Sequence, residues 1–573
     1  MMYSNIPSAQ TLVLYFQSRG IKNIVISPGS RNAPLTLSFT KNPFFSCFSI
    51  VDERCAAFFA LGMAQQLREP VGVICTSGSA MLNFYPAVAE AFYSDIPLVV
   101  VSADRPTNKI DIGDGQTIRQ EDIFEKHIGY SANLKQDSTH GFEQVKSKDK
   151  QETIQAYNEL EIGKALDIAF KTFSPVHINI PFEEPLYDLM ETPIVELSKV
   201  QTMEDAGKVE TDWSRLFPIW NASPRKMVLI GVNPPEDLDG AIVELLANDE
   251  SVFVFTETTS NVHHPNFFPS IDSIIAPIEK SSDRESLFQS LQPDLLVTLG
   301  GLIVSKKIKA FLRKYQPKHH WHIDSKKAYD TFYCLSEHIT THPNTFFGNG
   351  LGNFQKIESS YRNSWLQTKN NYELKKQAYL EKIGFSDFSV FHQIQGEIPK
   401  DYQVHLANSS TVRYNQLFPM DPSLHVYCNR GTSGIDGSTS TAIGASVFYD
   451  NPTLLITGDL SFFYDSNGLW NQYIRPDFRI VLINNSGGGI FRILPGFEET
   501  EEFSTFFETS HQHKAEHLAQ MFQFEYLKAG NEKEVGQALK NFYEPSQKPK
   551  ILEIFTPREA NNKILLDYFD FIS

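Results

Sequence analysis

Short apolar segments alternate with amphipathic segments through the first two hundred residues. Apolar runs of strand length begin with NIVIS at 23–27 and FSCFSIVD at 45–52, and others follow at 71–77, 97–103 and 175–182. Segments between them carry apolar residues at helical spacing, most clearly ERCAAFFALGMAQQL from Glu53. Regular alternation of this kind predicts a doubly wound, mainly parallel sheet.

The alternation returns twice further along the chain. A middle group of predicted strands lies at 227–232, 252–258, 294–300 and 319–324, and a C-terminal group lies at 403–408, 424–429, 452–459, 478–485 and 549–555. An exposed helical region over 359–383 precedes the last group. The pattern predicts an α/β protein of three doubly wound domains, over 1–190, 191–355 and 356–573. The polar segment 135–156 breaks the pattern and is interpreted as a surface excursion.

Composition narrows the classes of partner. The 573 residues include 51 Lys and Arg against 68 Asp and Glu, a net charge of −17, which argues against a nucleic-acid or anionic-membrane surface. The first twenty residues lack a basic segment before their apolar residues, so we expect no signal peptide, and no apolar run approaches the roughly 18 residues that span a membrane. Five scattered cysteines without a CxxC pair predict buried free thiols and a cytoplasmic location.

Two polar strand ends in the C-terminal group suggest a metal site. Gly458-Asp459 follows one predicted strand, and Asn484-Asn485 follows the next. Parallel strands present these ends at one edge of the sheet, where a carboxylate and an amide oxygen suit Mg²⁺. The glycine run 487–489 would let phosphates approach the backbone. Each dipeptide alone is more typical of a turn, and Arg492 stands where a dinucleotide-binding loop needs Gly or Ala.

The segment from Gly458 to Phe491 resembles the signature of the thiamin diphosphate enzymes, and NNSGGGIF is similar to the menaquinone-pathway synthases within that family. Leu460 departs from the Gly that many members carry. The resemblance implies thiamin diphosphate with Mg²⁺, or Mn²⁺ in its place, bound by Asp459, Asn485 and Gly487. It further implies cofactor contacts from Glu53, Thr76, Ser77, Gly78, Gly458, Asp459, Leu460, Ser461, Asn485, Gly487, Gly488 and Ile490.

Glu53 is the predicted catalytic residue. VDERCAAFFALGMAQ resembles the family's glutamate segment, which implies that the Glu53 carboxyl hydrogen-bonds the aminopyrimidine and helps it act as a base. The alternative is a first-turn glutamate favoured by the helix dipole. In this family the cofactor lies between the N-terminal, pyrimidine-binding domain of one subunit and the C-terminal, diphosphate- and metal-binding domain of another. The resemblance therefore implies a homodimer or homotetramer with its sites at the subunit interface.

The implied reaction is decarboxylation of 2-oxoglutarate, followed by 1,4-addition of the succinyl carbanion equivalent to isochorismate. Both substrates are dianions, which arginine binds well. Segments similar to those of the synthases supply the predicted polar contacts, namely Ser30, Arg31, Arg105, Gln116, Lys306, Ser409, Arg413 and Arg430. Lys307 is the alternative to Lys306, and each arginine taken singly is more typical of a solvated surface. An apolar wall is expected from Ile490, Phe491 and Leu494.

Two other functions stay open at the level of sequence. One is a different thiamin diphosphate-dependent 2-oxoacid carboligase or decarboxylase, and the other is a non-catalytic thiamin diphosphate-binding regulator. SPGSRN, NSSTVR and NRGTSGIDG are not accounted for by the first alternative, and the presence of Glu53, Asp459 and Asn485 together argues against the second.

Overall fold

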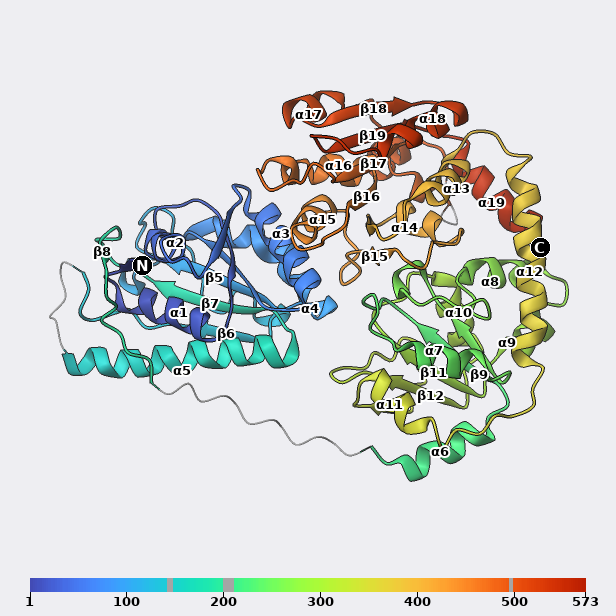
Figure 1. Ribbon diagram of the computed structural model, residues 1–573, viewed down its shortest axis with the longest axis horizontal. Helices are drawn as coiled ribbons and strands as arrows, with labels where there is room; N and C mark the ends of the chain where they lie inside the picture. Colours follow the sequence, from blue (N-terminus) through green and yellow to red (C-terminus); the bar gives the residue numbers. More distant parts are fainter. Residues whose placement is uncertain (142–147, 199–210, 494–497) are drawn as a thin grey trace. The chain divides into compact units, whose positions relative to one another are not determined.

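A computed structural model of the chain describes residues 1–141, 148–198, 211–493 and 498–573 (Figure 1). These residues form two compact units. The first unit comprises Met1–Ala206, Gly431–Asp450 and Ser461–Phe478, and the second comprises Gly207–Arg430, Asn451–Leu460 and Arg479–Ser573. Each unit is described by itself below.

The first unit is built on a six-stranded parallel sheet. Its strand order is β3 (Ser46–Ser49), β2 (Asn23–Ile26), β4 (Val71–Cys75), β5 (Leu98–Asp104), β7 (Val176–Pro181) and β6 (Tyr130–Asn133). Helices α1 (Pro7–Ser18) and α5 (Lys148–Thr172) lie together on one face, where Leu12 and Phe16 join Ile24 and Ile178 in the core (Figure 1). Burial of these apolar side chains is the main force holding the helices to the sheet.

Helix α3 (Glu53–Leu67) packs closely against α15 (Ser438–Ser446) of the same unit. Glycines allow the approach, since a Cβ on Gly62 would lie 2.0 Å from the carbonyl oxygen of Thr441. The relation is reciprocal, because a Cβ on Gly444 would lie 2.0 Å from the carbonyl oxygen of Phe59. Backbone therefore meets backbone along this helix pair.

The second unit holds two further parallel sheets. The central sheet has the order β10 (Val252–Phe255), β9 (Lys226–Ile230), β11 (Leu295–Leu299), β12 (His319–Ile323) and β13 (Glu337–Ile339). The C-terminal sheet has the order β15 (His425–Tyr427), β14 (Gln403–Leu406), β16 (Thr453–Gly458), β17 (Arg479–Asn484), β19 (Lys550–Phe555) and β18 (Glu525–Ala529). Helix α12 (Tyr361–Leu380) contacts α8 (Ile271–Lys280) beside the central sheet and α19 (Asn561–Ile572) beside the C-terminal sheet.

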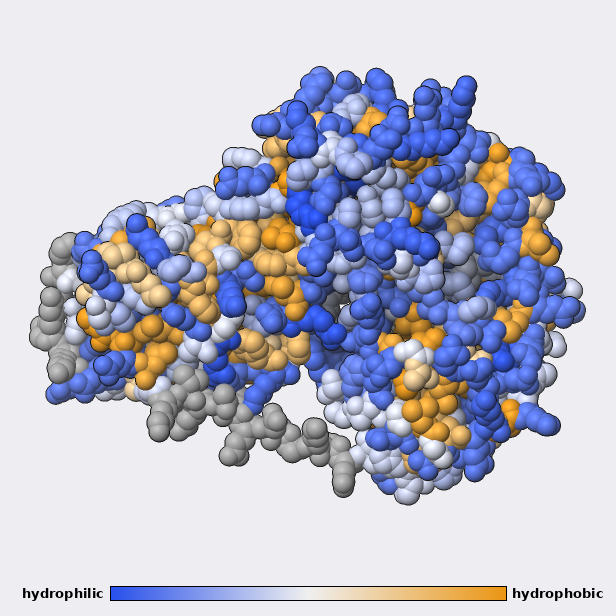
Figure 2. Space-filling model, viewed as in Figure 1, coloured by the Kyte–Doolittle hydropathy of each residue, from blue (hydrophilic) through white to orange (hydrophobic). Residues whose placement is uncertain are grey.

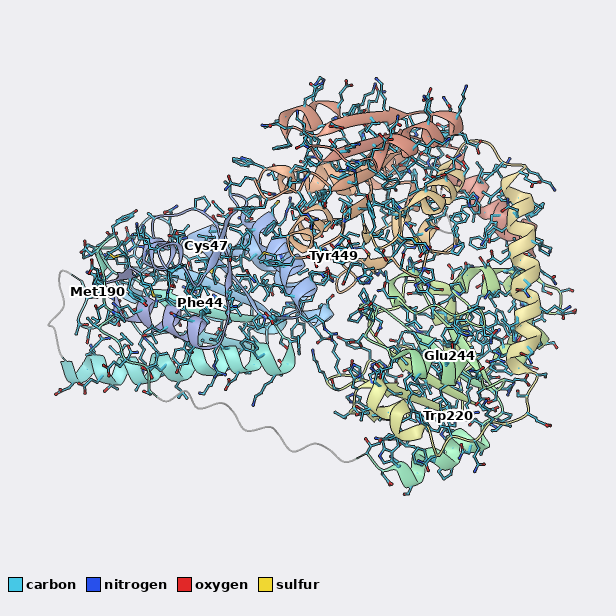
Figure 3. The ribbon with its side chains drawn as sticks, viewed as in Figure 1. Phe44, Cys47, Met190, Trp220, Glu244 and Tyr449 are labelled. Atoms are coloured by element: carbon cyan, nitrogen blue, oxygen red, sulfur yellow. The ribbon has the colours of Figure 1, made fainter. Side chains whose placement is uncertain are left out.

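Aromatic side chains pack one helix against the central sheet. Trp220 of α6 (Trp213–Ala222), labelled in Figure 3, is buried. Its ring stacks on that of Phe354, with the two centroids 4.3 Å apart. At the C-terminal sheet, Figure 2 shows mainly hydrophilic residues over α17 (Glu516–Met521) and α18 (Glu532–Phe542). Helix α18 turns its apolar stripe inward, with Val535, Leu539 and Phe542 in the core. The remaining helices of eight or more residues are α2 (Ala33–Thr40), α4 (Tyr85–Ser94), α7 (Gly240–Ala247), α9 (Arg284–Leu291), α10 (Lys306–Lys314), α11 (Pro343–Gly350) and α13 (Asp387–Glu397).

The predicted α/β class with three parallel sheets is confirmed, and so is the helix preceding the last sheet. The interpretation of 135–156 as a surface excursion is wrong at Asp137 and Ser138, which are buried, and from Lys148 onward, where α5 begins; residues 142–147 lie outside the described residues. Between β4 and β5 the chain forms a 3₁₀ turn (Gly78–Phe84) and then α4. All five cysteines are free, but Cys47 and Cys334 are partly exposed rather than buried. Within the described ranges, every helix is too short or too polar to cross a bilayer.

The α3–α15 contact generates a stability prediction. Gly62→Ala should lower the free energy of unfolding by roughly 1–3 kcal/mol, because its methyl group would overlap the Thr441 carbonyl. Thermal unfolding measures the change. The matched control is Gly536→Ala in α18, where a Cβ would have nothing within 4 Å; the same substitution should there stabilise by up to about 1 kcal/mol. Equal effects at the two glycines would contradict the packing argument.

Candidate active site

Three neighbouring strands of the first unit bring predicted site residues to one edge of their sheet. The loop after β2 contacts the end of β4, where the backbone N–H of Arg31 donates to Thr76 Oγ1 at 3.3 Å. Gly29 is needed at this approach, since a Cβ there would lie 2.3 Å from the Thr76 Cβ. Ser30 is exposed beside them, while Arg31 is buried.

The Arg31 guanidinium is held from two sides. It donates to the Phe182 carbonyl oxygen at 3.0 Å and to Glu184 Oε1 at 3.2 Å. Burial lowers the pKa of Arg31, and the nearby guanidinium of Arg105 lowers it further. The buried Nε atoms of both arginines have no hydrogen-bond partner among the described residues. Two close cations with unused donors make this edge locally positive, which suits a carboxylate ligand.

The loop that follows β5 covers the end of β4. A Cβ on Gly78, which has φ +88°, would lie 3.3 Å from the carbonyl oxygen of Gln116. The Gly78 N–H donates to Gln120 Oε1 at 2.8 Å, and Gln120 also donates to the Ala103 carbonyl oxygen. Gln120, which was not predicted from the sequence, thereby ties this loop to the strand ends. Ser77 is buried with an unpartnered Oγ among the described residues.

Glu53 begins α3 at the same edge. The Asp52 side chain caps the helix by accepting from the Cys55 N–H at 3.2 Å, which fixes the first turn. Burial raises the pKa of Glu53. The charge of Glu53 also helps to raise the pKa of Cys75, whose burial is the larger cause, so Glu53 lies near the end of β4. A carboxyl with a raised pKa at this position can share a proton with a ring nitrogen.

The predicted metal ligands come together in the second unit. Strands β16 and β17 are parallel neighbours with Gly458 opposite Ile483, so Asp459 and Asn485 leave the same edge. Asp459 accepts from the N–H of Leu460 at 2.7 Å and of Gly487 at 3.0 Å. Asp459, the Asn485 amide and the Gly487 carbonyl offer hard oxygen donors, the set that Mg²⁺ prefers, so the donor chemistry fits the expected ion.

Other residues of the predicted site lie near these proposed metal ligands. His511, which the sequence analysis missed, places Nε2 3.3 Å from Asp459 Oδ2. Gly488 lies against Phe491, and both Ile490 and Phe491 are half-buried in the turn that follows. Leu494 lies outside the described residues. Ser461, which belongs to the first unit, is buried and donates to the Ile435 carbonyl oxygen at 2.7 Å.

A second group of cations lies in the second unit. Arg413 of α14 (Ser410–Asn415) donates to the Ser409 carbonyl oxygen at 2.7 Å, and Arg430 donates to Asn408 Oδ1 at 2.7 Å. Burial and the neighbouring Arg430 both lower the pKa of Arg413. Ser409 adopts φ 70°, a left-handed conformation that is unusual for serine and turns the chain sharply after β14.

The structure distinguishes the lysines that the sequence left open. Lys307 forms an ion pair with Glu279, whereas Lys306 is exposed at the start of α10. Lys309, which was not predicted, is half-buried near Arg430 and Glu257, and burial lowers its pKa. Lys309 therefore joins Lys306 as a cation at this group.

Glu257 is the acidic counterpart of these cations and was also missed. Its carboxylate accepts from the N–H of Val304 and of Ser305, each at 2.8 Å, and so holds the entry to α10. Burial raises the pKa of Glu257 to about 7, although these hydrogen bonds and Arg430 act in the opposite direction. The partners of its carboxylate lie 47 and 48 residues away in the chain, so only tertiary contacts reveal its role.

Comparisons with known proteins agree on one family. Residues 8–128 match the thiamine pyrophosphate enzyme, N-terminal TPP binding domain, and residues 408–554 match the corresponding C-terminal TPP binding domain. The chain is 52% identical to the 2-succinyl-5-enolpyruvyl-6-hydroxy-3-cyclohexene-1-carboxylate synthase of Flavobacterium johnsoniae, over 99% of each chain. The protein of the same name from Christiangramia forsetii is 52% identical over 100% of each, and that from Porphyromonas gingivalis is 38% identical over 100% of this chain and 98% of its own.

The raised pKa of Glu257 predicts how stability changes with pH. The folded protein keeps the Glu257 proton up to about pH 7, whereas an unfolded chain releases it near the ordinary value of 4.5. The protonated Glu257 side chain therefore contributes fully to the free energy of unfolding below pH 4.5, and this contribution is lost as pH rises through 7. The side chain introduced by Glu257→Gln cannot ionise, so the variant should not share this loss. As pH rises from 4.5 to 7, its free energy of unfolding should therefore increase relative to that of the wild type by up to roughly 3 kcal/mol.

Urea unfolding at about pH 5 and about pH 8 measures that gain. The exposed Glu532 supplies a matched control, because Glu532→Gln in α18 should follow the wild-type pH dependence. A Glu257→Gln variant with the wild-type pH dependence would contradict the prediction.

Proposed function

Because the chain belongs to the family of 2-succinyl-5-enolpyruvyl-6-hydroxy-3-cyclohexene-1-carboxylate synthases, among the thiamine pyrophosphate enzymes, we propose that it is a transferase with that activity. It decarboxylates 2-oxoglutarate and joins the succinyl unit to isochorismate by 1,4-addition, releasing CO₂ in menaquinone biosynthesis. Full-length identity of 52% to synthases of this name is the observation that carries the proposal.

The proposed cofactor is thiamin diphosphate, whose thiazolium ring stabilises the negative charge left when CO₂ departs. Glu53 shares its proton with the pyrimidine ring, and its raised pKa supports that role. Thr76, Ser77 and Gly78 line the pyrimidine, since they lie at the same strand end as Glu53. The other proposed cofactor contacts are Gly458, Leu460, Ser461, Gly488 and Ile490, at the edge that carries the metal ligands.

A divalent ion, Mg²⁺ or Mn²⁺, is proposed to bind Asp459, Asn485 and the carbonyl oxygen of Gly487. Its charge would neutralise the diphosphate, while the small glycines of the run 487–489 would let the phosphates approach the backbone closely. The hydrogen bond from Gly487 to Asp459 supports this site, because it joins two of the proposed ligands.

The proposed polar contacts to the substrates form two groups, each of which contains positively charged side chains. Ser30, Arg31, Arg105 and Gln116 belong to the first unit, and Lys306, Ser409, Arg413 and Arg430 to the second. Close pairs of guanidinium groups favour dianionic ligands, because each carboxylate relieves the repulsion between two cations. Ile490, Phe491 and Leu494 are proposed as the apolar wall, which would disfavour the charged carboxylate relative to the charge-dispersed state that forms as CO₂ leaves.

We propose a homodimer or homotetramer in the cytoplasm, with each site shared between two subunits. Domains of 1–190, 191–355 and 356–573 follow the three sheets, and the two family matches, 8–128 and 408–554, fall within the first and third. The free cysteines support a reducing compartment.

The proposed activity is tested with both substrates together. Incubation with 2-oxoglutarate and isochorismate should yield CO₂ and the coupled adduct in equal amounts, and omission of either thiamin diphosphate or Mg²⁺ should abolish both. Mass spectrometry of the adduct and a CO₂ assay measure the outcome. Release of CO₂ without the adduct would instead indicate a simple 2-oxoacid decarboxylase.

The role of Glu53 is tested by Glu53→Gln. The amide keeps the shape of the side chain but cannot share a proton with the ring, so turnover should fall by roughly 10²–10⁴-fold while cofactor affinity changes little. Steady-state kinetics measure turnover, and titration calorimetry with thiamin diphosphate and Mg²⁺ measures binding. A turnover equal to the wild type would refute the assignment.

A further inference from the structure

Asp387 is a buried carboxylate directly behind the proposed metal ligands. It is the first residue of α13 and is 2% exposed. Its Oδ2 accepts from Asn485 Nδ2 at 3.0 Å, and its Oδ1 accepts from Thr556 Oγ1 at 2.5 Å. Asn485 follows β17 and Thr556 follows β19, which are neighbouring strands. One carboxylate therefore joins the ends of two strands.

The contact with Asn485 decides which way that amide faces. A carboxylate oxygen only accepts hydrogen bonds, so the Asn485 nitrogen must face Asp387. The amide oxygen lies at the opposite end of the same planar group and is thereby turned away from Asp387. Only the oxygen can bind a cation, and a rotated amide would present its nitrogen to the ion. Orientation of this amide is thus a requirement for the proposed site.

We propose that Asp387 is a positioning residue for metal binding, which holds the Asn485 amide with its oxygen toward the divalent ion. The inference rests on the proposed metal site and adds a residue that is not itself among the proposed metal ligands. Partners of this kind orient the groups that bind a metal, and their loss weakens metal affinity by about 10–100-fold. The Asn561 contact holds the backbone of Asp387 in place, since Asn561 Oδ1 accepts from its N–H at 2.9 Å.

The test measures the Mg²⁺ concentration that gives half-maximal thiamin diphosphate binding to the full-length protein, followed by quenching of intrinsic fluorescence. Asp387→Ala and Asp387→Ser remove the acceptor from Asn485 and should raise that concentration by about 10–100-fold. Asp387→Asn keeps an acceptor oxygen and should restore it to within about threefold of the wild type. Melting temperatures without metal show that each variant is folded.

Thr556→Val is the matched control, because it removes the other side-chain hydrogen bond of the same carboxylate and leaves the Asn485 contact in place. It should change the Mg²⁺ requirement by less than about threefold. An unchanged Mg²⁺ requirement in both truncations would overturn the inference, as would an equal loss in Thr556→Val or no rescue by Asp387→Asn. A wild-type protein that binds thiamin diphosphate without any divalent ion would instead refute the proposed metal site.

Discussion

The hydrogen bond from the Gly487 N–H to Asp459 is the contact on which the arrangement of the second unit's site depends. It joins the loops after two parallel strands, and parallel strands deliver their polar ends to one edge. The turn is possible because Gly487 adopts φ 150° and a Cβ there would lie 2.8 Å from the Glu508 carbonyl oxygen. Asp387 then completes the edge from β17 to β19. A site assembled from strand ends needs few residues of its own, since the sheet fixes their spacing.

Charge balance is the second constraint. Arg31 lies near Arg105, and Arg413 lies near Arg430, so like charges are held together at partly buried positions. Such pairs are costly unless acids or ligands offset them. Glu184 offsets part of the charge in the first unit, and Glu257 with Asp272 does so in the second. A chain of net charge −17 can thus build local positive pockets that a dianion completes.

The sequence predicted the sheets well where strands are apolar and central. It missed β6, whose residues YSAN are mostly polar, and the edge strands β13 and β18, because an edge strand faces solvent and carries little hydrophobic pattern. Residues with a recognisable segment, such as Glu53 and Asp459, were proposed from sequence. Gln120, Glu257, Lys309 and Asp387 were not, because their partners are distant in the chain and no local spacing marks them.

Three of the residues that the sequence missed share a physical task. Each is buried or half-buried and holds a proposed ligand-binding element in place: Gln120 at Gly78, Glu257 at the start of α10, and Asp387 at Asn485. Binding a dianion or a metal gains little if the side chains must first be ordered, since that ordering has an entropic cost. Contacts made during folding already order these side chains before a ligand binds. Short segments of the sequence thus supply the residues that carry the chemistry of the site. The orientation of those residues comes from polar contacts that form only once the sheets have assembled.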